Sequence, residues 1–124
     1  MRSLAAALAL ACSALVFAQP TGPNPNPTTR GYYRQPAIHG DTIVFVSEGD
    51  LWKVPVAGGV ATRLTSGSGE EAHPAISPDG KTIAFFFNDA ATTEIYTMPL
   101  EGGLPVRQTY GAARVSFVGW TPDG

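Results

Sequence analysis

Short apolar segments alternate with turn residues along most of the chain. The clearest two are Thr42–Ser47 and Thr82–Phe87, which are rich in β-branched and aromatic residues and follow Gly-Asp or Asp-Gly sequences. Such residues favour strands, and turn residues at the ends bound them. No helical pattern of useful length follows residue 18. The pattern therefore predicts an all-β fold.

The turn before the second segment has a clear mechanism. Its sequence is Ser77-Pro78-Asp79-Gly80. Proline pre-sets φ, aspartate can bond the local backbone, and glycine accepts a positive φ. We expect a tight turn that joins two antiparallel strands.

The same unit recurs along the chain. Leu51–Gly59 aligns with Ile95–Gly103 at an offset of 44 residues (95 − 51 = 44). The offset also superposes these pairs: Arg63 and Arg107, Thr65 and Thr109, Ile76 and Trp120, Pro78 and Pro122. A period of roughly 40–50 residues is typical of β-propeller blades.

Each repeat predicts four short strands. The first blade spans about residues 31–65, the second about 70–109, and the first strand of a third blade lies at about 115–124. The expected strands are about 35–38, 42–47, 50–56 and 60–64, then 72–76, 82–87, 94–99 and 105–109. Paired glycines at 58–59 and 102–103 would close each third strand onto the fourth. Because a propeller has 4–8 blades, we interpret the chain as the N-terminal piece of a longer protein with marginal stability alone.

The N-terminus has the pattern of a secretory signal. A short positive region, an apolar run and a compact cleavage site predict a signal peptide at 1–18, cut after Ala18. The apolar run is short for a membrane anchor, and the residues before Cys12 fit a lipoprotein poorly. Residues 19–30 form a Pro/Asn-rich linker. We therefore expect an exported, periplasmic or extracellular protein that contacts a membrane only during export, with no cysteine after cleavage.

Composition excludes one class of partner. The 124 residues carry a formal net charge of −2, and Lys and Arg occur singly rather than in a basic run. We expect no nucleic-acid binding.

Candidate chemistry is sparse. His39 and His73 lack a nearby third metal ligand and are assigned turn or rim roles. The loop Ser66–Gly69 lacks the Gly-x-Ser-x-Gly pattern of a nucleophile. Glu70 and Glu71 could bind a cation or a peptide N-terminus, but a solvated loop is the preferred interpretation.

The remaining candidates have structural explanations. Asp41 and Asp79 lie in turns, where aspartate bonds the local backbone. Trp52 and Tyr96 occupy equivalent third-strand positions and predict packing between blades, and Trp120 is also assigned to the core. We expect no catalytic, cofactor-binding or metal-binding residue in this chain.

The repeat resembles that of two related groups of proteins. Ala75–Phe85, then Glu94–Pro99 with Gly102-Gly103, resembles the propeller repeat of the TolB family and the tricorn proteases. Ile38–Val46 with Gly49-Asp50-Leu51-Trp52, and Val118–Gly124, are similar to the tricorn-type propeller. The resemblance covers Gly31–Gly124.

The resemblance implies a large, exported, oligomeric serine peptidase. In that family a six-bladed propeller comes first, a seven-bladed one follows, and a PDZ-like module and a tail-specific protease core complete the chain. It implies a non-catalytic propeller that gates peptides or contacts proteins through its face and packs on the parent's other domains. A TolB-like binding propeller and the propeller of a prolyl-oligopeptidase-type hydrolase are the alternatives.

One stretch departs from the family pattern. Phe86–Thr92 replaces the small residues and acidic-Gly turn that relatives have, and Asn88–Thr97 resembles a translated sequencing adapter with one mismatch at Ala90. We hypothesise that part of Phe86–Thr97 is a read artefact, which resequencing of the locus tests.

Overall fold

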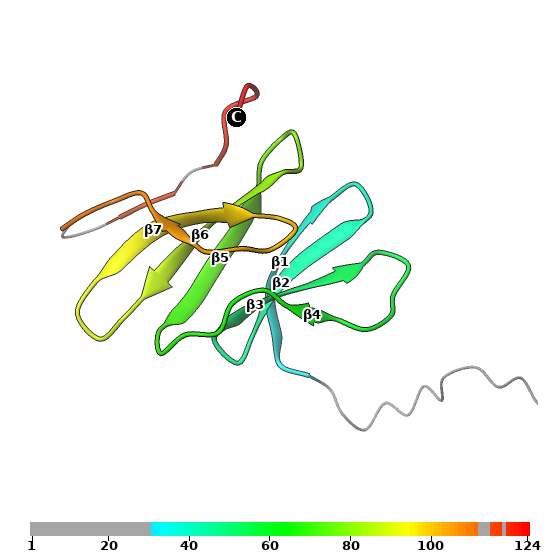
Figure 1. The fold of residues 1–124 in the computed structure, drawn as a ribbon, viewed down its shortest axis with the longest axis horizontal. Helices are drawn as coiled ribbons and strands as arrows, with labels where there is room; N and C mark the ends of the chain where they lie inside the picture. The colour runs from blue at the N-terminus through cyan, green and yellow to red at the C-terminus, as the bar shows by residue number, and fades with distance from the viewer. Residues whose placement is uncertain (1–30, 112–114, 118) are drawn as a thin grey trace, which may run out of the picture.

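Eight strands form two consecutive antiparallel sheets in the computed structural model, which describes residues 31–111, 115–117 and 119–124. The predicted signal peptide and linker lie outside these residues. The first sheet has the order β1-β2-β3-β4 and the second the order β5-β6-β7-β8. The strands are β1 (Tyr33–His39), β2 (Thr42–Ser47), β3 (Asp50–Pro55), β4 (Thr62–Arg63), β5 (Glu70–Ile76), β6 (Thr82–Asn88), β7 (Thr93–Pro99) and β8 (Val106–Arg107). Figure 1 shows the sheets side by side, with β1 and β5 in contact.

The two predicted blades are confirmed, with differences at their edges. The outer strands β4 and β8 are shorter than predicted at both ends. At their C-terminal ends, a threonine hydroxyl replaces a backbone carbonyl as the acceptor in each ladder. Leu51 N–H donates to Thr65 Oγ1 at 2.8 Å, and Ile95 N–H donates to Thr109 Oγ1 at 2.9 Å. The regular pairing stops there, although the chain stays attached to the neighbouring strand.

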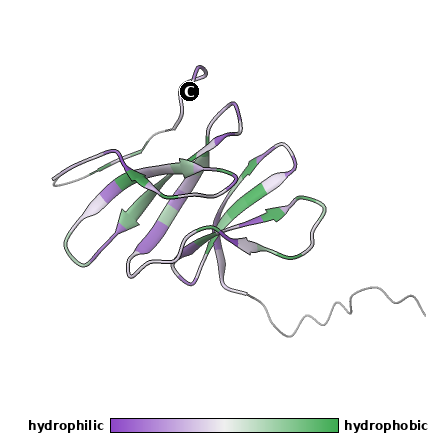
Figure 2. Ribbon diagram, in the orientation of Figure 1, coloured by the Kyte–Doolittle hydropathy of each residue, from purple (hydrophilic) through white to green (hydrophobic). Residues whose placement is uncertain are grey.

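The core lies between the two sheets. Strand alternation places Val44, Val46 and Leu51 of the first sheet against the second, where Ile83 and Phe85 meet them. Met98 and Leu100 complete this buried cluster. Figure 2 shows the hydrophobic colour concentrated on β2 and β6. Each sheet is therefore stabilised chiefly by burying apolar surface against its neighbour.

The turns follow the predicted chemistry. Gly80 has a φ of 70°, and its N–H donates to the Ser77 carbonyl at 2.9 Å. Gly58 and Gly102 also have positive φ values, of 87° and 109°, in the hairpins that lead to β4 and β8. No helix in the described residues is long and apolar enough to cross a membrane.

The segment predicted to begin a third blade is described only at residues 115–117 and 119–124. Residues 115–117 and 119–124 contain no strand, because no described residue pairs with their backbone. Trp120 nevertheless contacts the second sheet, since its Nε1–H donates to the Ala75 carbonyl at 3.0 Å. The final Pro-Asp-Gly segment closes a turn in which Gly124 N–H donates to the Thr121 carbonyl at 3.0 Å.

Candidate functional site

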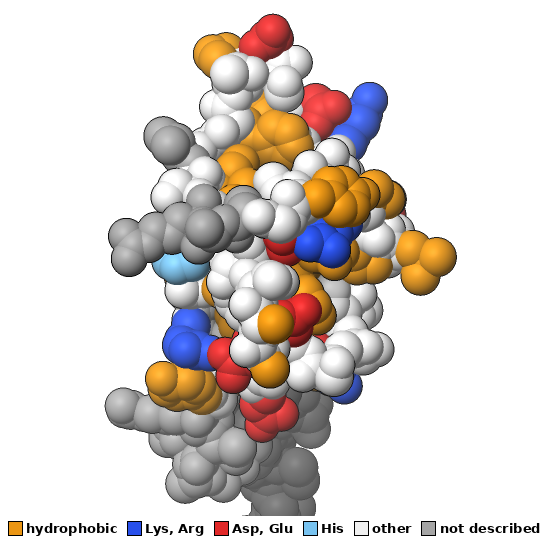
Figure 3. All heavy atoms as spheres, turned by 90° about the vertical axis from the view of Figure 1, so that its left-hand side faces the viewer, with side chains coloured by type: hydrophobic (Ala, Val, Ile, Leu, Met, Phe, Trp, Pro, Cys, Tyr) orange, Lys and Arg blue, Asp and Glu red, His pale blue; other side chains and the backbone are white. Residues whose placement is uncertain are grey.

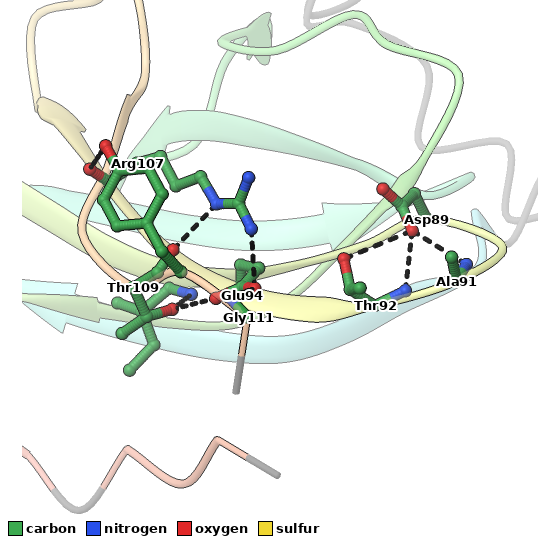
Figure 4. A network of polar contacts seen from close by, with 9 residues as sticks. Asp89, Ala91, Thr92, Glu94, Arg107, Thr109 and Gly111 are labelled. Atoms are coloured by element: carbon green, nitrogen blue, oxygen red, sulfur yellow. Dashed lines mark hydrogen bonds and ion pairs between the residues drawn. The ribbon is translucent and has the colours of Figure 1, made fainter. Parts of the chain in front are cut away.

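A buried carboxylate fixes the outer edge of the second sheet. Glu94 is only 2% exposed and accepts from Arg107 Nη2 at 2.6 Å, from Gly111 N–H at 2.9 Å, and from Thr109 Oγ1. Figure 4 shows these groups converging on it. The Thr109 hydroxyl is the main reason that the pKa of Glu94 is below its usual value, and Arg107 adds to this effect. The network ties β7 to β8 and to the segment that follows.

The first sheet repeats this network with one methylene fewer. Asp50 stands at the position of Glu94, and Arg63 Nη2 bonds its Oδ2. The shorter side chain leaves Asp50 Oδ1 buried without a hydrogen-bond partner. We call Asp50, Arg63, Thr65 and Glu71 the blade junction. It contains a carboxylate oxygen without a partner, whereas the equivalent carboxylate of the second sheet has hydrogen bonds to both of its oxygens.

Glu71 brings a second buried carboxyl group into the blade junction. It belongs to β5, is 4% exposed, and its Oε2 has no hydrogen-bond partner. Its own N–H donates to the Gly49 carbonyl at 2.7 Å, which pulls it against the first sheet. The prediction of a solvated loop is therefore wrong for Glu71, whereas the neighbouring Glu70 is exposed.

The environment of Glu71 changes its ionisation. Burial is the main cause, and the nearby Asp50 carboxylate the next, of a rise in the pKa of Glu71 from 4.5 to about 7. Arg63 lowers the pKa of Glu71, but its effect is smaller than those of burial and of Asp50. At neutral pH the two carboxyl groups therefore carry less than two full charges.

A cavity of about 270 Å³ adjoins the Glu71 carboxyl group. Phe85 and Thr65, 2% and 7% exposed, form its deep part. Its mouth is formed by Ser66 in the loop between the sheets and by Leu104, which is 88% exposed. The lining comes from the ends and loops of both sheets.

Each of the two histidines links the two sheets, and the two have different hydrogen-bond partners. His39 Nε2 lies 2.9 Å from the Pro78 carbonyl oxygen. His73 lies in β5 and bonds Gln35 of β1. Among the described residues, no three His, Cys, Asp or Glu side chains are grouped so that they could hold a metal ion.

The turn residues behave largely as predicted. Asp79 Oδ1 accepts from Ser77 Oγ at 2.6 Å and from Lys81 N–H at 3.0 Å, and these bonds hold the pKa of Asp79 below its usual value. Asp41 differs, because its backbone carbonyl accepts from Val56 N–H at 2.9 Å, and among the described residues no backbone N–H donates to its carboxylate. Ser66–Gly69 is a loop, as expected.

The aromatic predictions are confirmed only in part. Tyr96 packs between the sheets, with its ring centroid 6.1 Å from that of Phe85. Trp52 lies on the opposite face of the first sheet, where it lines a shallow hollow with Tyr33 and Phe45. Trp120 is half-buried rather than in the core.

Sequence reasoning missed the blade junction. The offset of 44 superposes Asp50 on Glu94 together with the paired Arg and Thr positions, and this signal could have revealed the repeated network. The burial of Glu71 had no comparable signal, since Val115 occupies the equivalent position in the next repeat.

Two consecutive four-stranded antiparallel sheets with this strand order and these turns are blades of a β-propeller. Residues 30–124 match the family described as the tricorn protease N-terminal β-propeller domain. The chain belongs to this family.

Individual relatives agree with this assignment. "Tricorn protease homolog 1" of Streptomyces coelicolor is 37% identical over 99 residues, covering 79% of this chain and 9% of the relative. The crystal structure of the tricorn protease superposes with a TM-score of 0.61 at 30% identity, over 66% of this chain and 8% of that one. A TolB structure from Agrobacterium tumefaciens has a TM-score of 0.57 at 24% identity, over 62% of this chain and 33% of that one, and shares the fold. The chain thus spans less than a tenth of the length of these two tricorn proteins.

Proposed function

We propose that this chain is the N-terminal propeller portion of an exported, tricorn-like serine peptidase, and that it admits or binds peptides without cleaving them. The observation that carries the proposal is the family match over residues 30–124. The tricorn relatives are named as proteases, and the matched family is described as the N-terminal β-propeller domain of the tricorn protease. Export is supported by the signal-like pattern of residues 1–18.

The hydrogen bonds of the described residues support a non-catalytic role. The hydroxyl of Ser77 is engaged by Asp79 and by Thr82 N–H at 2.9 Å, so it is held in a turn. His39 bonds a backbone carbonyl, and His73 bonds Gln35. A nucleophilic serine needs an adjacent base, and neither histidine bonds a serine hydroxyl.

A peptide or protein partner fits the surface better than a nucleic acid. Figure 3 shows a face on which hydrophobic side chains form patches and the Lys and Arg side chains lie apart from one another. Binding to nucleic acid requires clustered positive charge. The propeller face and the remaining domains of the parent chain are the partners we propose.

The TolB-like alternative is a propeller that acts through protein contacts alone, and the shared fold with a TolB structure favours it as the second candidate. A peptidase assay on the purified 124-residue chain tests the non-catalytic role. We expect no turnover of a panel of fluorogenic peptides. Turnover that a serine-directed inhibitor abolishes would contradict the proposal.

A further inference from the structure

The cavity beside Glu71 has the composition of a binding site rather than of a packing fault. Its volume of about 270 Å³ holds several water-sized groups. The aromatic rings of Phe85, Phe87 and Tyr96 line it together with the apolar side chains of Leu64, Leu104 and Pro105. Glu71 is the one carboxylate that lines it, and no Lys or Arg does so.

The Glu71 carboxyl group is only partly hydrogen-bonded: Thr65 and the Glu71 backbone contribute hydrogen bonds that lower its pKa, but one oxygen has no partner. Its Oε2 is buried without a hydrogen-bond donor, and the nearest other carboxyl group, that of Asp50, also has an unpartnered oxygen. Leaving a buried charged group unsatisfied costs more than leaving a neutral one. Of these two carboxyl groups only Glu71 lines the cavity, so a ligand there that supplies hydrogen-bond donors and positive charge would act on Glu71.

We infer that this cavity binds a primary ammonium group carried on an apolar chain. The ammonium would donate to Glu71, while its carbon chain would contact the rings of Phe85 and Phe87. Aromatic faces attract cations as well as apolar groups, so the lining suits both parts of such a ligand. An anionic ligand would be repelled by Glu71 and Asp50. The inference stands on the cavity alone and is independent of whether the parent protein is a peptidase.

Access to the cavity is open. Leu104 is 88% exposed, and Ser66 and Pro105 at the mouth are also exposed. A ligand can therefore enter from solvent without moving β4 or β8. The N-terminal amine of a peptide and the end of a lysine side chain share the required chemistry.

Titration with butylammonium, followed through backbone amide NMR shifts of the 124-residue chain, tests the inference. Butan-1-ol serves as the neutral probe of similar shape. We expect butylammonium to shift the amides of Thr65, Ser66 and Glu71 in a saturable way, and butanol to bind at least about tenfold more weakly. Equal binding of the two probes would overturn the inference, as would no saturable shift with butylammonium.

Matched variants separate the carboxyl group from its surroundings. Glu71→Gln should weaken butylammonium binding by about tenfold or more, because it removes the charge but keeps the shape. Glu70→Gln changes the adjacent, exposed glutamate and should leave binding within about twofold. If Glu71→Gln binds as tightly as the wild type, the inference is wrong. The variant's unchanged amide pattern elsewhere shows that it is folded.

Two further probes distinguish the sources of the ammonium. Leucine amide presents an α-amine, and Nα-acetyl-lysine amide presents a side-chain amine. If either probe binds in a saturable way and Glu71→Gln weakens that binding, the inference is supported. The probe that binds then identifies the source of the ammonium group. Binding of both probes without dependence on Glu71 overturns it. The charged groups that act on Glu71 are Asp50 on β3 and Arg63 on β4. Because Glu71 must be ionised to bind an ammonium group, binding should tighten as pH rises through about 7.

Discussion

Gln35 of β1 and His73 of β5 hydrogen-bond to each other, although each has a backbone conformation that residues other than glycine seldom adopt. Their φ values are 51° and 49°, and each lies at the bulge of its strand, directly before a proline. His73 N–H donates to Gln35 Oε1 at 2.8 Å, and the two Nε2 atoms lie 3.2 Å apart. The pair joins the first strands of the two blades at equivalent positions.

This pair fixes the protonation site of a neutral His73. Because Gln35 Oε1 accepts from a backbone N–H, Gln35 Nε2 must donate, and His73 Nε2 must accept. We predict that His73 carries its proton on Nδ1 at pH 8, and that Gln35→Ala removes this preference. Long-range ¹H–¹⁵N NMR spectra of the imidazole identify the tautomer. An Nε2–H tautomer in the wild-type chain would refute the assignment.

The Glu94 network should be a main source of stability for the second blade. Glu94→Ala leaves Arg107, Thr109 and Gly111 N–H without their shared acceptor, so we expect a loss of about 2–4 kcal/mol in the free energy of unfolding. Glu101→Ala is the control, because the Glu101 side chain is 91% exposed and, in the described part of the chain, its ion pair is with Lys53. We expect the control to change stability by less than about 0.5 kcal/mol. Urea denaturation measures both, and equal effects would show that burial of the carboxylate is unimportant.

Ionisation of Glu71 should make stability fall as pH rises. The folded chain keeps this proton up to a pH of about 7, while an unfolded glutamate loses it near its ordinary pKa of 4.5. Unfolding therefore releases a proton between these values, and the stabilisation present below pH 4.5 is lost as pH rises through about 7. We expect a decrease of about 1–3 kcal/mol across this window from Glu71.

Urea unfolding at several pH values measures this slope. Glu71→Gln should flatten it and raise stability at pH 8, whereas Glu70→Gln should leave it in place. A slope that persists in Glu71→Gln would mean that another group controls the pH dependence.

A side chain at Gly80 should destabilise the turn. A Cβ there would lie 2.6 Å from the His39 ring, and the φ of 70° already disfavours other residues. Gly40 has a φ of 52° but nothing within 4 Å of its own Cβ position. We expect Gly80→Ala to lower the unfolding free energy by about 1 kcal/mol more than Gly40→Ala, as thermal or urea unfolding measures. Equal losses would mean that the His39 ring moves away without cost.

The sequence predicted the strands well because their determinants are local. The β-branched and aromatic run after residue 81 and the turn around Pro78 predict β5 and β6 without knowledge of the rest of the fold. The repeat then supplied the pairing order. Trp52 shows the limit of this reasoning, since alternation tells which residues share a face but not which face meets the next blade.

The site depends on contacts between segments distant in the chain. Glu71 follows a Ser/Gly loop, so its local sequence is typical of a solvated segment. Its burial arises from the bond to the Gly49 carbonyl and from the proximity of Asp50, which only the packing of the two blades creates. The cavity likewise joins residues of both blades.

The sequence of the gene beyond codon 124 tests the central claim most directly. We predict further propeller repeats with the spacing that superposes Trp52 on Tyr96, followed by a PDZ-like module and a tail-specific protease core with a nucleophilic serine. The same read establishes whether the codons for Phe86–Thr97 are genuine. An open reading frame that ends after about six blades, or that continues into a Gly-x-Ser-x-Gly hydrolase domain, would contradict the account.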